Sequence, residues 1–236
     1  MGGGLFSCYN HFMKLGSIIR KVSGIYIIGL VITAGLVFIP AWTFDYWQGW
    51  LFLGFLFIPM FFVLLYMLTY ERKLLGKRMN VREKRGEQKY IQLINTLLFV
   101  LIMGVAGLDH RYGWSQMPVW SVIASDILMF AGYMVFMRAM FHNEYASRVI
   151  EVQRGQRVVD TGPYAVVRHP MYAAAMLMYS FIPPALGSLW AFVPLILIFI
   201  MLFLRIFDEE KALIKGLKGY KQYMRKVRYR MVPGLW

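Results

Sequence analysis

Cysteine and histidine are both scarce in this 236-residue chain. It contains a single cysteine, Cys8, and four histidines that are dispersed along the sequence. One cysteine excludes an intramolecular disulfide framework and a cysteine-rich metal site. Dispersed histidines do not form a pattern of metal ligands, so we predict no bound metal.

Charged residues are also few, at 16% of the chain, whereas 59% of the residues are hydrophobic. Several apolar runs reach the roughly 20 helical residues needed to cross a hydrocarbon core of about 30 Å. The alternating pattern of barrel strands is absent, so the backbone must satisfy its hydrogen bonds within helices. The sequence therefore predicts an all-α, polytopic transmembrane helical bundle, and it has no cleavable signal-peptide pattern.

Several common functional motifs are missing as well. Neither a Gly-x-Gly-x-x-Gly fingerprint nor a P-loop occurs, so no soluble-type nucleotide fold is indicated. The start MGGGLF resembles a myristoylation signal, but Phe6 stands where Ser or Thr is required. The net charge of +14 comes from Lys and Arg clustered beside apolar runs. Such clusters are a topology signal and a contact for anionic lipid rather than for nucleic acid.

We predict about six membrane segments. The last two are short and are separated by Pro183-Pro184 and Gly187-Ser188, a pattern that favours a helical hairpin, with one broken segment as the alternative. Pro59 predicts a kink in the second segment. The segments cover about residues 22–42, 48–70, 91–109, 119–141, 171–186 and 188–207.

The positive charges predict the orientation of these segments. Residues 71–90 and 208–236 carry eight Lys and Arg residues each, and loop 142–170 carries four, whereas the opposite loops carry almost none. By the positive-inside rule, both termini face the cytoplasm, in a cell inner membrane or the endoplasmic reticulum. Loop 142–170 and the tail then meet at the cytoplasmic face. Six tryptophans lie near the proposed outer boundary, as an aromatic belt should: Trp42, Trp47, Trp50, Trp114, Trp120 and Trp190.

One polar stretch, GPYAVVRHPMY at 162–172, precedes the fifth segment. Gly162-Pro163 predicts a turn, and Pro170 suits the first turn of a helix. Arg168 and His169 would lie at the positive end of that helix dipole, an arrangement that favours a bound anion. For these two residues alone, a snorkelling Arg168 and a capping His169 are the favoured interpretation. The complete string favours a functional site.

A second charged stretch, LFLRIFDEEKAL, ends the sixth segment. Arg205 and Glu209 are four residues apart and therefore share one helix face. A charge at the edge of a membrane helix is a functional hypothesis by default, although an exposed ion pair worth less than about 1 kcal/mol is the alternative. We interpret Asp208 as structural.

Other charged residues have simpler interpretations. We expect Arg138 to snorkel from the fourth segment toward the cytoplasm. Asp126 lies deeper and predicts a buried polar contact between helices. The run Asp109-His110-Arg111 is expected to be interfacial.

Three strings in order, GPYAVVRHPMY, LRIFDEEKAL and GYKQYMRKVRYRMVPG, resemble the isoprenylcysteine carboxyl methyltransferase family of integral membrane enzymes. The resemblance covers about residues 142–236, which we treat as a methyltransferase core after N-terminal transmembrane helices in 1–141, together one structural domain. It implies S-adenosyl-L-methionine as the cofactor, bound in a pocket at the cytoplasmic face.

The resemblance also implies particular site residues. It places Arg205 at the substrate as the catalytic and substrate-binding residue. The tail sequence LKGYKQY departs from the acidic stretch that is common in the family. The implied cofactor contacts are Gln156, Arg157, Val158, Val159, Tyr164, His169, Pro170, Met171, Tyr172 and Glu209.

The implied reaction is carboxyl O-methylation of an isoprenylated cysteine or a related lipid-like acceptor. A carboxylate is already ionised at neutral pH, so the enzyme needs proximity and a positive group rather than a general base. The permanently charged Arg205 suits that role. Three alternatives stay open: a phospholipid amine N-methyltransferase, an NADPH-dependent membrane sterol or steroid reductase, and a non-catalytic scaffold. The related Arg-His-Pro-Asn-Tyr element of the reductases has Asn where this chain has Met171.

Overall fold

The computed structural model describes the backbone of residues 3–79 and 86–236, and the side chains of residues 16–79, 86 and 88–236. The first two residues of the myristoylation-like start, and some of the basic residues of 71–90, lie outside this range. Within the described residues the fold is helical throughout and contains no strand, as the sequence predicts. The elements are α1 (Gly3–Ala41), α2 (Trp47–Thr69), α3 (Arg72–Met79), α4 (Gly86–Tyr112), α5 (Val119–His142), the short 3-10 turn η1 (Gly162–Ala165), α6 (Pro170–Ser180), α7 (Ile182–Ala185), α8 (Phe192–Gly216) and α9 (Tyr220–Lys226).

Four helical stretches in the described residues are long and apolar enough to cross a membrane. They are Gly16–Ala41, Trp47–Thr69, Gln88–Tyr112 and Val119–His142, and they match the first four predicted segments. The predicted fifth and sixth segments correspond to α6 with α7 and to α8. The count of six therefore stays a prediction for these last two segments, while the integral membrane character is clear.

The break between the last two segments agrees with the prediction only in part. Pro183 and Pro184 lie inside α7 rather than between helices, because the first turn of a helix tolerates residues that lack an N–H. The chain turns at Gly187, which belongs to the predicted break and has φ 70°. Consequently α8 begins at Phe192, not at 188, and it continues beyond 207 to Gly216. In the second segment, α2 continues through Pro59.

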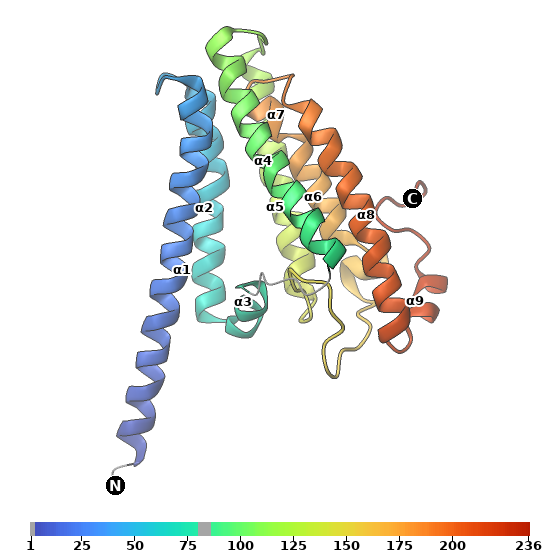
Figure 1. Ribbon diagram of the computed structural model, residues 1–236. Helices are drawn as coiled ribbons and strands as arrows, with labels where there is room; N and C mark the ends of the chain where they lie inside the picture. The colour runs from blue at the N-terminus through green and yellow to red at the C-terminus, as the bar shows by residue number, and fades with distance from the viewer. Residues whose placement is uncertain (1–2, 80–85) are drawn as a thin grey trace.

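In the view of Figure 1, α1 and α2 form one group of helices and α4 to α8 another, and α1 packs against α4 where the two groups meet. Glycines permit close contact between helices, as in many membrane bundles. A Cβ atom on Gly107 of α4 would lie 2.6 Å from the carbonyl oxygen of Val37 in α1. A Cβ atom on Gly132 of α5 would lie 2.9 Å from the backbone nitrogen of Met178 in α6. The largest hydrophobic cluster joins residues of both groups.

All six tryptophans of the predicted aromatic belt are exposed at the end of the bundle where α1 meets α2, and their position at the outer membrane boundary stays a prediction. Asp109, at the end of α4, is buried within the protein, because only 1% of it is exposed. Its carboxylate accepts bonds from Ser115 Oγ (2.7 Å) and Ser188 Oγ (2.5 Å). Asp109 therefore ties the α4–α5 connection to the α7–α8 connection.

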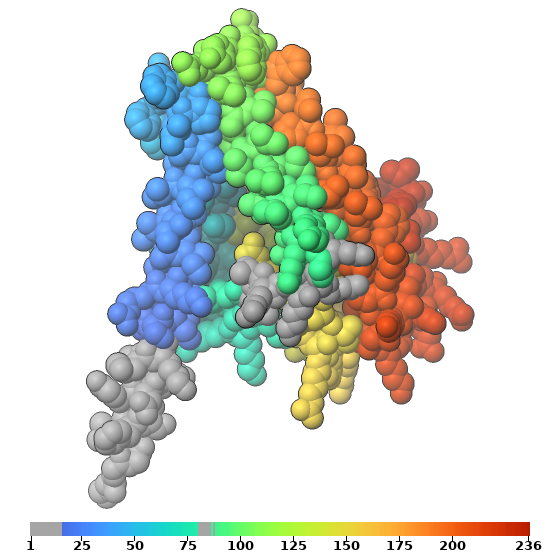
Figure 2. Space-filling model, in the orientation of Figure 1, coloured from blue at the N-terminus to red at the C-terminus, as the bar shows by residue number. Residues whose placement is uncertain are grey.

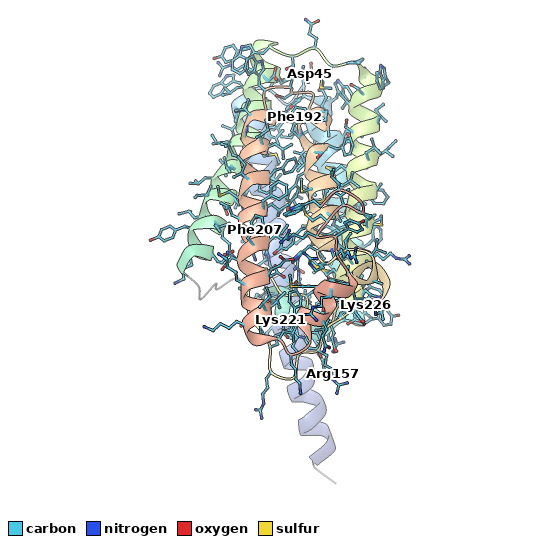
Figure 3. All side chains as sticks on the ribbon, turned by 90° about the vertical axis from the view of Figure 1, so that its right-hand side faces the viewer. Asp45, Arg157, Phe192, Phe207, Lys221 and Lys226 are labelled. Atoms are coloured by element: carbon cyan, nitrogen blue, oxygen red, sulfur yellow. The ribbon has the colours of Figure 1, made fainter. Side chains whose placement is uncertain are left out.

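Asp126 in α5 is fully buried, as predicted. The predicted polar contact between helices is not found, because neither carboxylate oxygen has a hydrogen-bond partner among the described residues. Figure 3 shows Asp45 and Phe192 near one end of the molecule and Arg157, Lys221 and Lys226 near the other. The basic end contains loop 142–170, α3 and α9.

Candidate active site at the basic end of the bundle

A cavity of about 570 Å³ lies at the basic end, between α3, α4, α5, α6, α8 and loop 142–170. Figure 2 shows the surface hollowed between α1 and the lower part of α4. The structure brings together on the cavity wall every residue that the sequence analysis assigned to the site. Whether they contact a ligand stays a prediction. These wall residues are Gln156, Arg157, Val158, Val159, Tyr164, His169, Pro170, Met171, Tyr172, Arg205 and Glu209.

The turn and the helix start predicted from GPYAVVRHPMY are confirmed. Gly162 has φ 56° and opens the 3-10 turn η1. A Cβ atom there would lie 2.6 Å from the ring of His142, so the position requires glycine for both conformation and space. Pro170 is the first residue of α6. Tyr164 and Met171, which follow these two features, both line the cavity.

The hydroxyl of Tyr172 joins the two charged residues of α8. It donates to Glu209 Oε2 (2.5 Å) and accepts from Arg205 Nε (3.0 Å). Arg205 also donates from Nη1 to Gln88 Oε1 (3.2 Å) and from Nη2 to the Arg148 carbonyl (2.6 Å). Both Arg205 and Glu209 line the cavity. They are therefore members of an interior network and not an exposed surface pair.

Gln88 connects this network to a second acidic residue. Its Nε2 donates to Asp208 Oδ2 at 2.6 Å, and Gln88 itself is fully buried. Asp208 therefore holds the side-chain amide of Gln88, and the oxygen of that amide accepts a hydrogen bond from Arg205. This contact agrees with the structural interpretation of Asp208.

The favoured interpretation of Arg168 and His169 is wrong. Arg168 is 7% exposed and does not snorkel; its Nε donates to Glu210 Oε1 at 2.8 Å. His169 precedes α6 but makes no side-chain capping bond, and its Nε2 lies 3.3 Å from the same oxygen. Arg230 Nε donates to Glu210 Oε2 at 2.9 Å. The anion that the sequence favoured at this helix end is thus the carboxylate of Glu210, supplied by the protein itself.

Arg168 also fastens the C-terminal tail to the site. Its Nη1 donates to the carbonyls of Val227 (2.8 Å) and Arg228 (2.6 Å). The backbone N–H groups of Arg168 and His169 donate to carbonyls of the same stretch, 227–230. The RHP element is therefore a scaffold that joins α6, α8 and the tail. His169 contributes the ring nitrogen Nε2 to this scaffold.

Tyrosines line much of the remaining wall. Burial raises the pKa of Tyr164 to about 12, and its carbonyl accepts from the hydroxyl of Tyr223 at 2.7 Å. Burial also raises the pKa of Tyr220 far above its usual range. The buried Tyr220 hydroxyl has no hydrogen-bond partner in the described part of the chain. The cavity therefore offers aromatic faces and one unpaired donor.

Sequence reasoning missed Glu210, although a signal for it existed. The buried face of α8 repeats every four residues, at Ile198, Leu202 and Ile206, and Glu210 continues this repeat. A carboxylate on an apolar stripe indicates a buried ion pair rather than a charge balancing the tail. Gln88 gave no such signal, because it follows a basic stretch far from the recognised strings. Among the described residues, no group of three or more His, Cys, Asp or Glu could hold a metal ion.

The fold and the cavity define an integral membrane helical protein with a polar site at one end. Residues 122–215 match the family model of the isoprenylcysteine carboxyl methyltransferase (ICMT) family. The match confirms the resemblance seen in the sequence and includes the loop, α6 and most of α8. It supports a membrane methyltransferase-like function.

The chain is also similar to a Delta(14)-sterol reductase of Methylotuvimicrobium alcaliphilum. The two are 27% identical over 136 residues, which are 51% of this chain and 32% of the reductase. The chain thus matches about a third of the length of this curated relative.

Proposed function

We propose that this protein is an S-adenosyl-L-methionine-dependent methyltransferase that O-methylates the carboxylate of an isoprenylated cysteine or a related lipid-like acceptor. The observation that carries the proposal is the hydroxyl of Tyr172, which bonds both Arg205 and Glu209 inside one cavity. This arrangement sets a permanent cation and a carboxylate side by side. The cation suits an anionic acceptor, and the carboxylate suits a cationic donor.

The residues present fit the donor. The cavity volume of about 570 Å³ falls within the roughly 300–1,000 Å³ of ligand pockets. Tyrosine faces attract a sulfonium through cation–π interaction, and Tyr164, Tyr172 and Tyr220 line the wall. Val158 and Val159 provide apolar surface, and the unpaired hydroxyl of Tyr220 can bond a polar group of the ligand.

When bound, S-adenosyl-L-methionine supplies a methyl group on a positively charged sulfur. The protein's own residues then act by position and charge. Arg205 orients the acceptor carboxylate so that one oxygen can attack in line, and the carboxylate needs no proton acceptor because it is already ionised. Tyr172 fixes the guanidinium through its hydroxyl. Glu209 accepts hydrogen bonds from the ammonium end of the donor.

We further propose that the basic end faces the cytoplasm and that α6 with α7, and α8, complete a six-segment bundle. The concentration of Arg157, Lys221 and Lys226 at that end supports this orientation under the positive-inside rule (Figure 3). The lipid part of the acceptor would then enter from the bilayer, and the water-soluble donor from the cytoplasm.

The second candidate is an NADPH-dependent membrane reductase. The observation in its favour is the similarity to the Delta(14)-sterol reductase. The Met171 that stands where the reductase element has Asn argues against it. A phospholipid amine N-methyltransferase is less favoured, because Arg205 gives no advantage beside an amine nucleophile.

A labelled-methyl assay on the purified protein in detergent separates these functions. We expect transfer from S-adenosyl-L-methionine to a small prenylcysteine analogue, and none to phosphatidylethanolamine. Transfer to phosphatidylethanolamine with a pH profile set by amine deprotonation would favour the lipid N-methyltransferase instead. Oxidation of NADPH with a sterol, without methyl transfer, would establish the reductase.

A further inference from the structure

Arg78 is a cavity residue that none of the recognised strings contains. It lies in α3, upstream of the matched region 122–215, and its guanidinium lines the same cavity as Arg205 and Glu209. It is held over the ring of Phe136 in α5 at 5.6 Å, and its Nη1 lies 3.4 Å from the carbonyl of Ser147. Both contacts come from residues that also line the cavity.

Among the described residues, the positive charge of Arg78 has no acidic partner. Burial and the neighbouring Arg148, in this order, lower the pKa of Arg78 to about 10. Arg148 lines the cavity as well. In the described part of the chain, no carboxylate lies within salt-bridge distance of either guanidinium. Arg78 is partly buried and Arg148 is exposed, and two cations that line one cavity without an acidic partner among the described residues favour an anionic ligand.

Glu209 brings a negative charge to the cavity that Arg78 lines. Arg78 and Glu209 both interact electrostatically with the hydroxyl of Tyr164. Arg78 interacts in the same way with Tyr172, to which Glu209 is hydrogen-bonded. A cation and a carboxylate thus line the same cavity as these two tyrosines. The head group that complements this pattern carries an ammonium and a carboxylate a few ångströms apart, which is an α-amino acid.

We propose that Arg78, with Arg148 beside it, binds the α-carboxylate of the methyl donor while Glu209 holds its ammonium. This inference rests on the proposed function, because it takes S-adenosyl-L-methionine as the ligand. It assigns a role to α3, which lies outside the matched region. It also gives the two arginines different ligands, since Arg205 binds the methyl acceptor and Arg78 binds the methyl donor.

Calorimetric titration of the full chain in detergent tests this assignment with two probes. They are S-adenosyl-L-methionine and its decarboxylated analogue, which differ only in the carboxylate. Charge-assisted hydrogen bonds to a carboxylate predict that the wild-type protein binds the first probe about tenfold or more tightly than the second. Arg78→Met should bring the two affinities within about twofold and leave binding of the decarboxylated probe unchanged. The retained binding also shows that the variant is folded.

Arg138→Met is the matched control, because Arg138 is an exposed arginine of α5 that does not line the cavity. It should keep the full preference for the carboxylate. Equal affinities for the two probes in the wild-type protein would overturn the inference whatever the variant does, as would an Arg78→Met protein that keeps the wild-type preference. Wild-type protein that binds neither probe would contradict the proposed function itself.

Discussion

Replacing Arg205 with alanine should reduce the rate of methyl transfer by about 100-fold or more. The substitution removes the cation that holds the acceptor carboxylate, and losses of this size are typical when a preorganised charge is removed from an active site. It also removes the bond that positions Tyr172. Donor affinity should change by no more than about threefold, because Glu209 and the tyrosines on the wall remain. Steady-state kinetics with a prenylcysteine analogue, together with donor titration, measure both quantities.

Arg205→Lys is the informative companion. Lysine keeps the charge but cannot reproduce the three contacts to Tyr172, Gln88 and the Arg148 carbonyl, because it lacks the planar fork. We expect intermediate activity. Unchanged turnover in Arg205→Ala would refute the role of Arg205 at the acceptor. A loss of donor binding as large as the loss of rate would move Arg205 to the donor side.

Replacing Glu210 with alanine should lower the free energy of unfolding by about 3–5 kcal/mol. The carboxylate pairs with Arg168, His169 and Arg230 while it is only 4% exposed, and removal of one partner leaves buried cations uncompensated. The tail 227–230 should loosen as well, because Arg168 holds its carbonyls. Denaturant unfolding in detergent measures the first effect, and limited proteolysis of the tail measures the second.

Asp160→Ala is the matched control for this prediction. Asp160 also pairs with a cation, Lys226 Nζ at 2.8 Å, but both side chains are largely exposed. Solvent and salt screen such a pair, so its loss should leave unfolding nearly unchanged. Equal effects of the two substitutions would show that the Glu210 network contributes little to stability.

Protonation of Glu210 should also lower the stability of the fold at acid pH. Burial alone would raise its pKa, but hydrogen bonds from His169, Arg168 and Arg230 outweigh this effect and lower the pKa from 4.5 to about 2. A carboxyl with a depressed pKa in the folded state stabilises fully above its unfolded pKa. Its contribution should therefore disappear as the pH falls from about 4.5 to about 2. Glu210→Gln should reduce the change in the free energy of unfolding over this pH range. An unchanged pH dependence in the variant would contradict the role of Glu210.

Local patterns in the sequence predicted much of the fold. Apolar runs located the helices, Gly162-Pro163 located the turn, and Pro170 located the start of α6, because each signal depends on a few consecutive residues. The ends of helices were less predictable. Of the predicted break, Gly187 is the residue at which the chain turns, whereas Pro183 and Pro184 fit the first turn of α7.

The partners of the site residues were harder to predict, because they come from distant parts of the chain. Arg168 finds carbonyls 59 and 60 residues away, and Arg205 finds Gln88 117 residues away. No local spacing encodes such contacts. The different positions of the adjacent residues Glu209 and Glu210 were, by contrast, encoded locally. The four-residue repeat of α8 places Glu210 in the buried network, whereas Glu209 lines the cavity.

Donor binding to the purified chain tests the central claim most directly. Titration with S-adenosyl-L-methionine should give saturable binding at one site per chain, and Glu209→Gln should weaken it about tenfold or more, because a charge-assisted bond to the donor ammonium is lost. Folded protein that shows no saturable binding would contradict the account. The same conclusion would follow if binding were present but insensitive to Glu209→Gln and to substitutions of Tyr164 and Tyr172.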